Sequence, residues 1–189
     1  MTCNSYKMRL YRYIYILFLL TLHTGCKNHE FSDNITNRSP YFSAIVGDND
    51  NNIFRNVNFG LKQDVVKKAE TSKLFDFAPD HMFYEVTFPD DSSQFQEYAD
   101  IEYYFNENDI LDIMVARIYV NDSVQQSQLY NNLQQYYHAK LGSSAIDKFN
   151  GEFWKGQFTQ GKSKPMDYYV FMEPLPKEFG ISLEFKLQK

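Results

Sequence analysis

Residues 181–187 alternate strictly between apolar and polar side chains, and this pattern constrains the fold more than any other feature. The apolar positions hold Ile181, Leu183, Phe185 and Leu187, and the positions between them hold Ser182, Glu184 and Lys186. Successive side chains of a β-strand point to opposite faces, so this segment has one face for a core and one for water. The sequence therefore predicts an antiparallel sheet with at least one buried face.

Further strand-like segments, rich in aromatic and β-branched residues, occur at 81–88, 100–105, 110–120, 152–158 and 167–172. Turn-forming residues at 106–109 separate the second segment from the third and predict a β-hairpin. The aromatic content of 17% agrees with a sheet-rich fold, because aromatic side chains favour pleated, half-buried surfaces.

Two segments have the spacing of amphipathic helices. Apolar residues recur at helical intervals within residues 61–70. In the second helix, Ser123 and Gln126 form an expected capping box at the start, and Gly142 provides the stop. We therefore expect an α+β domain in which two helices pack on one face of an antiparallel sheet of about five strands, in the order α-β-β-β-α-β-β-β.

Charge and cysteine content exclude several functions. The formal net charge is -5, and the sequence has no stripe of Lys and Arg to neutralise phosphates, so we expect no nucleic-acid partner. The two cysteines, Cys3 and Cys26, both precede the strand-forming part of the chain. That part therefore has no disulfide, no thiolate metal site and no cysteine nucleophile.

An apolar stretch near the N-terminus has the features of an export signal. Lys7, Arg9 and Arg12 precede residues 13–22, which are mostly apolar. About ten apolar residues match the core of a signal peptide, whereas a membrane-spanning helix needs about 20. We expect residues 1–25 to be a signal peptide that is removed. Two alternatives remain. The segment would be an uncleaved signal anchor, or it would be an ordinary signal peptide whose removal does not involve Cys26, which would then be an incidental thiol.

The residues that follow, His23, Thr24, Gly25 and Cys26, resemble the lipobox of bacterial lipoproteins, which ends in an invariant cysteine. His23 stands where that family usually has leucine. The resemblance implies cleavage before Cys26, lipid attachment to this cysteine, and membrane anchoring through its acyl chains. Lys27 stands where an Asp would favour the inner membrane, so the resemblance implies a protein anchored in the bacterial outer membrane, facing the periplasm or the cell surface.

The segment after the cysteine is rich in Asn, Asp and Ser. Such a composition buries too little apolar surface to order itself. We therefore expect residues 26–55 to be a flexible polar tether, and residues 56–189 to form a single α+β globular domain.

The start of this domain carries a second resemblance. Gly60 and Leu61 lead into a helix that carries Val65, and this segment is similar to the start of small envelope domains of the outer-membrane-assembly lipoprotein BamE and of the β-lactamase-inhibitor fold. The resemblance implies a protein-binding module.

Sequence motifs for catalysis are missing. The chain contains no Gly-x-Ser-x-Gly elbow, no phosphate-binding glycine loop, no dinucleotide fingerprint and no His-Glu-x-x-His metal spacing. We therefore predict no catalytic residue, no metal and no cofactor. Paired carboxylates of a glycosidase are defined by their separation in space, so a hydrolase remains open.

Five aromatic residues are the candidate binding residues. Trp154 is the sole tryptophan, and its ring would serve either as an aromatic platform for a partner or sugar or as part of the core. Tyr103–Tyr104 and Tyr168–Tyr169 are adjacent pairs in strand-like segments. Each pair must point one ring to each face of the sheet. If helices cover one face only, the rings on the other face form a contact surface.

These observations favour a lipid-anchored envelope protein that acts as a non-enzymatic protein-binding module. It would serve as an accessory subunit of an envelope assembly or as an immunity or inhibitor protein, and its partners would be the membrane and another envelope protein. The alternative is a cell-surface hydrolase or carbohydrate-binding lipoprotein, which requires acids or aromatic rings that converge in a pocket.

Overall fold

The computed structural model describes residues 39, 41–47, 52–88, 97–147, 151–161 and 163–188. The expected signal peptide, Cys26 and the tether up to residue 38 lie outside the described residues. Within these ranges, no helix combines the length and the apolar character that crossing a membrane requires.

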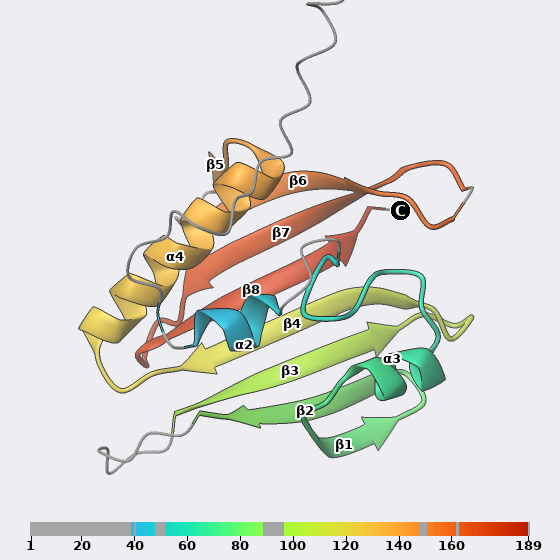
Figure 1. Cartoon of the computed structure of the whole chain (residues 1–189), viewed down its shortest axis with the longest axis horizontal. Coiled ribbons are helices and arrows are strands. Elements are labelled where there is room, and N and C mark those ends of the chain that lie inside the picture. The colour runs from blue at the N-terminus through green and yellow to red at the C-terminus, as the bar shows by residue number, and fades with distance from the viewer. Residues whose placement is uncertain are drawn as a thin grey trace, which may run out of the picture. The chain divides into compact units, whose positions relative to one another are not determined.

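One eight-stranded antiparallel sheet dominates the structure (Figure 1). The helices are α2 (Phe42–Val46), α3 (Gln63–Ala69) and α4 (Ser123–Leu141). The strands are β1 (Lys73–Ala78), β2 (His81–Thr87), β3 (Tyr98–Phe105), β4 (Leu111–Tyr119), β5 (Ala145–Ile146), β6 (Glu152–Phe158), β7 (Met166–Pro174) and β8 (Gly180–Leu187).

The sheet consists of two meanders that meet at its centre. The strand order is β1-β2-β3-β4-β8-β7-β6-β5. Helix α4 carries the chain from β4 to the opposite edge, and the chain then returns strand by strand until β8 pairs with β4 (Figure 1). Residues far apart in the sequence, such as Arg117 and Ser182, are therefore neighbours.

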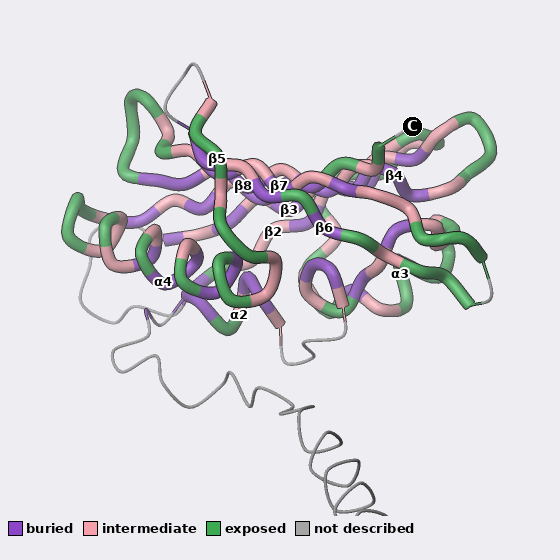
Figure 2. Tube along the Cα trace, turned by 90° about the horizontal axis from the view of Figure 1, so that it is seen from above, coloured by how far each residue is buried: buried purple, intermediate pink, exposed green. Residues whose placement is uncertain are grey.

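The helices all lie on one side of the sheet. Figure 2 shows α2, α3 and α4 on the same side, while no described helix covers the opposite side. We call that opposite side the open face. The predicted α+β class, with helices on one face of an antiparallel sheet, is confirmed.

The core lies between the sheet and these helices. Alternate residues of β3 are buried, including Ile101 and Tyr103, and in β8 the buried residues are Ile181, Leu183 and Phe185. The alternation in the sequence thus correctly assigns the two sides of these strands.

Helix α4 begins one residue earlier than the predicted capping box implies. The N-cap is Asp122, whose side chain accepts hydrogen bonds from the backbone N–H groups of Val124 and Gln125. The side chain of Gln126 instead donates to the carbonyl of Gly180. Gly142 is the C-cap with φ of 91°, in the left-handed region that favours glycine, so the predicted stop is confirmed.

The predicted number of elements is too low. The described residues hold eight strands instead of about five, and three helices instead of two. Strand β1 has largely exposed residues and no alternation, and β5 is only two residues long. Neither edge strand has a buried face, and a strand without one leaves no periodic signal.

Residues 41–47 and 52–55 differ from the expected flexible tether because they pack into the domain. Tyr41, Phe42, Ile45, Val46 and Phe54 are all buried. Ser39 also anchors this segment, since its backbone N–H donates to the side chain of Asn132 over 2.6 Å. The apolar patch within the polar sequence is therefore core.

A buried ion pair fastens this segment to the sheet. Arg55 Nε and Nη2 each lie 2.9 Å from a carboxylate oxygen of Glu70, and the Tyr103 hydroxyl donates to the same carboxylate over 2.8 Å. Burial by itself raises the pKa of Glu70. The hydrogen bond and charge of Arg55, together with hydrogen bonds from the Ser72 backbone and the Tyr103 hydroxyl, outweigh it and hold the pKa below its ordinary value.

Candidate binding face

The open face carries many aromatic side chains that are only half-buried. Because side chains alternate along each strand, the residues next to the buried ones point to this face. The aromatic residues placed there are Phe83, Tyr98, Tyr104, Tyr119, Phe153, Tyr169 and Phe171. A sheet face with this many partly exposed rings has the composition of a protein contact surface.

The candidate aromatic residues divide between the two faces. Tyr104 and Tyr169 lie on the open face and remain partly exposed. Tyr103 and Tyr168 point to the helices and are 0% and 3% exposed. The expectation that each pair splits its rings is confirmed, and only one member of each pair is accessible to a partner.

Trp154 belongs to the core rather than to a contact surface. Its side chain is 1% exposed, and its ring lies 5.5 Å from that of Tyr137 and 5.6 Å from that of His138 in α4. Within the described part of the chain its Nε1 has no hydrogen-bond partner. Trp154 therefore fixes α4 on the sheet.

A polar cluster occupies the middle of the open face. The carboxylate of Glu102 accepts hydrogen bonds from the Arg117 guanidinium and from the Tyr104 hydroxyl. The hydrogen bond to Glu102, followed by burial, raises the pKa of Tyr104 to about 12. Tyr104 therefore remains a neutral hydrogen-bond donor at physiological pH.

The open face has an excess of negative charge. On its strands the acidic residues are Asp76, Glu85, Asp100, Glu102, Asp167, Glu173 and Glu184, and the basic ones are Lys73, Arg117, Lys155 and Lys186. Burial and then the charge of Glu102 raise the pKa of Asp100. Burial and the like charge of Glu102 therefore disfavour the ionised form of Asp100.

Two tyrosines form a stacked pair at one end of the face. Tyr98 and Tyr119 are directly opposite on β3 and β4, with ring centroids 4.6 Å apart and ring planes 25° apart. Burial and then the charge of Asp100 raise the pKa of both hydroxyls. The pair forms a flat, rigid aromatic surface.

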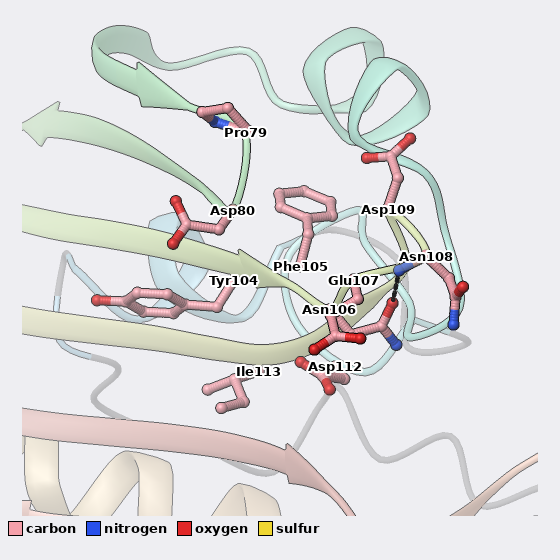
Figure 3. A pocket seen from close by; sticks show the side chains of 10 residues that line it. All are labelled: Pro79, Asp80, Tyr104, Phe105, Asn106, Glu107, Asn108, Asp109, Asp112 and Ile113. Carbon is pink, nitrogen blue, oxygen red and sulfur yellow. Dashed lines mark hydrogen bonds between the residues drawn. The ribbon is translucent and has the colours of Figure 1, made fainter.

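A hollow of about 820 Å³ lies at the other end, between the β1–β2 and β3–β4 turns (Figure 3). Four carboxylates border it, those of Asp80, Glu107, Asp109 and Asp112, together with Tyr104 and Ile113. Figure 3 shows the side chains of Asp80 and Asp109 pointing in different directions. These two carboxylates do not converge on one point, as a pair of catalytic acids must.

A second hollow of about 460 Å³ adjoins the first. Its lining includes Tyr169, Lys186 and Gln188, and it shares Asp112 and Ile113 with the first hollow. We call the two together the cross-strand groove. Tyr104 and Tyr169, both candidates from the sequence, thus line neighbouring parts of one depression.

A serine and a histidine lie close together beside α4, but their hydrogen bonds do not suit nucleophilic catalysis. Ser144 Oγ is 2.9 Å from His138 Nε2 and donates to the carboxylate of Glu152 over 2.8 Å. The single hydroxyl hydrogen is used by Glu152, so His138 Nε2 donates to Ser144 instead of accepting its proton. The cluster fastens the C-terminal end of α4 to β6.

No group of three or more His, Cys, Asp or Glu residues suited to a metal ion occurs within the described ranges. No family model, curated protein or solved structure matches this chain. The function therefore has to be inferred from the geometry of the open face.

Sequence reasoning missed most of this site. Asp100, Glu102 and Arg117 belong to the predicted strands, and their alternation with buried residues places them on the open face. The hairpin of β3 and β4 was predicted, but its register was not. The pairing of β4 with β8 was also not predicted, because the two strands are more than sixty residues apart and meet only through the return of the second meander.

Proposed function

We propose that this protein is a lipid-anchored bacterial envelope protein whose domain binds another protein through the open face of its sheet, without catalysing a reaction. The observation that carries the proposal is a sheet face with half-exposed aromatic residues that no described helix covers. Sheet faces with many partly exposed aromatic side chains are typical of surfaces that contact another protein.

The arrangement of this face supports a contact role. The stacked Tyr98 and Tyr119 provide a rigid apolar area at low entropic cost, because tyrosine loses few rotamers on binding. Arg117 lies between them and the cross-strand groove, and its guanidinium is held by Glu102. Aromatic residues with a fixed arginine are typical of the residues that dominate binding energy.

Site-specific photo-crosslinking in the native cell tests this proposal. A crosslinking amino acid at Tyr119, on the open face, should give one discrete adduct, whereas the same amino acid at Gln135, exposed on α4, should give none. The absence of an adduct from Tyr119 would refute the proposal, and so would an adduct of the same size from both positions. The lipid anchor is tested separately by palmitate incorporation, which Cys26→Ser should abolish.

A carbohydrate-binding or hydrolytic surface protein is the second candidate, because the groove combines carboxylates with the rings of Tyr104 and Tyr169. Tyr rings that face a groove can stack on sugars. Titration with oligosaccharides of bacterial envelopes distinguishes the two candidates: saturable binding that Tyr169→Ala abolishes would favour this second function, and its absence would favour protein binding.

A further inference from the structure

The cross-strand groove forms a continuous path over four neighbouring strands. Tyr104 lies on β3, Ile113 on β4, Lys186 on β8 and Tyr169 on β7, and these residues follow one another in the register of the sheet. With strands ~4.8 Å apart, Tyr104 and Tyr169 are ~14 Å apart. An extended polypeptide covers this distance with about four residues.

Ile113 is the apolar position within the path. It belongs to both hollows and is only partly buried by its neighbours. Tyr104 lies next to it on β3, and Lys186 lies next to it on β8, with Tyr169 one strand farther. An apolar side chain of a bound segment would therefore gain most from lying on Ile113.

The charges on the two sides of Ile113 are opposite. Asp80, Glu107 and Asp109 border the hollow at the turns, where Glu107 and Asp109 are exposed, and Lys186, next to Ile113 on β8, borders the second hollow. The Tyr104 ring at the acidic end can also accept a cation on its face. A bound segment is thus favoured when a basic side chain lies at the turns and an acidic one lies near Lys186.

We infer that the cross-strand groove binds a short extended segment of the partner protein, with a basic residue at the β3–β4 turn, an apolar residue on Ile113 and an acidic residue at Lys186. This inference rests on the proposed function, and it adds which types of side chain the bound segment carries and in which order they lie along the groove. The acidic excess of the whole open face favours the same basic class of partner.

The test uses the full-length chain in detergent micelles and the acetylated, amidated peptide Arg-Ala-Leu-Ala-Glu with a spin label at one end. A label beside the peptide Arg should broaden the NMR signal of the Asp109 amide. A label beside the peptide Glu should broaden that of the Gln188 amide. Equal broadening from both labels, the reverse pattern, or no broadening would overturn the inference.

Charge variants give an independent readout. The double variant Glu107→Gln/Asp109→Asn should weaken peptide binding about fivefold, because each exposed charge pair contributes up to about 1 kcal/mol. Glu178→Gln is the matched control, since Glu178 is an exposed acid in the β7–β8 turn and does not line the groove. Equal weakening by the control would show a general charge effect and overturn the inference.

Failure of the inference and failure of the proposed function give different results. If the Tyr119 crosslink to the native partner persists while the peptide fails to bind, the groove does not hold such a segment and the contact role of the open face stands. If the Tyr119 adduct is missing, the proposed function itself falls.

Discussion

Arg55 and Glu70 form a two-point ion pair in the interior, with Nε and Nη2 of the arginine each 2.9 Å from a carboxylate oxygen. The arginine precedes α3 and the glutamate is its C-cap. The Tyr103 hydroxyl of β3 donates a hydrogen bond to the same Glu70 carboxylate. This network joins the segment around Arg55 to the sheet, so it supports the core under the open face.

Loss of one partner of this pair should strongly destabilise the fold. Arg55→Met leaves the Glu70 charge buried without its cation, and we expect the free energy of unfolding to fall by about 3 kcal/mol. Urea unfolding measures it. Lys68→Met is the matched control, because the Lys68–Asp64 pair is exposed and contributes at most about 0.5 kcal/mol. Similar losses in both variants would contradict this role of the buried pair.

The same pair predicts a pH dependence. The folded state lowers the pKa of Glu70 below its ordinary value of 4.5, so its stabilisation is present above pH 4.5 and is lost as the pH falls through the folded pKa. The difference in unfolding free energy between the wild type and Glu70→Gln should therefore shrink as the pH falls below 4.5. Urea unfolding over a series of pH values measures it. A difference that stays constant or grows would be inconsistent with the lowered pKa.

Asp122, rather than Ser123, should be the residue on which the start of α4 depends. Its side chain satisfies the N–H groups of Val124 and Gln125, and Asp122→Ala should cost about 1 kcal/mol of stability. Ser123→Ala serves as the control and should cost much less. Thermal unfolding of both variants measures the difference, and the opposite order would support the capping box expected from the sequence.

The sequence was informative where one side of an element is buried. Alternation placed Ile181, Leu183 and Phe185 on the covered face and showed that Tyr103 and Tyr104 point in opposite directions. It could not separate core from tether at Tyr41–Val46, because this short apolar patch lies within a polar segment and is ordered only by long-range contacts, such as that of Ser39 with Asn132.

Long-range pairing explains the rest of what was missed. Arg117 lies between apolar neighbours in a predicted strand, and these neighbours give no reason to expect Glu102 beside it. The register of β3 with β4 brings Glu102 and Arg117 together on one face. A predicted hairpin without its register leaves such pairs undetermined, since a shift by one residue moves every side chain to the other face.

The negative charge of the open face should reduce the stability of the free protein. Burial and the charge of Glu102 raise the pKa of Asp100, so its ionised form is disfavoured in the folded state. Asp100→Asn should therefore increase the free energy of unfolding by about 0.5 kcal/mol. It should also weaken binding of a basic partner.

Asp167→Asn is the matched control on the same face, because Lys155 lowers the pKa of Asp167. This substitution should not stabilise the protein. Urea unfolding of both variants at neutral pH gives the comparison, and stabilisation by Asp167→Asn but not by Asp100→Asn would argue against charge crowding around Asp100.

The dissociation constant for the partner that photo-crosslinking identifies tests most directly whether the open face is the binding surface. Tyr119→Ala removes one ring of the stacked pair and should weaken binding about tenfold or more, as expected for an aromatic residue that contributes strongly to an interface. Val124→Ala removes an exposed apolar side chain on α4 and should leave the constant unchanged. An unchanged constant for Tyr119→Ala together with weaker binding for Val124→Ala would contradict the account.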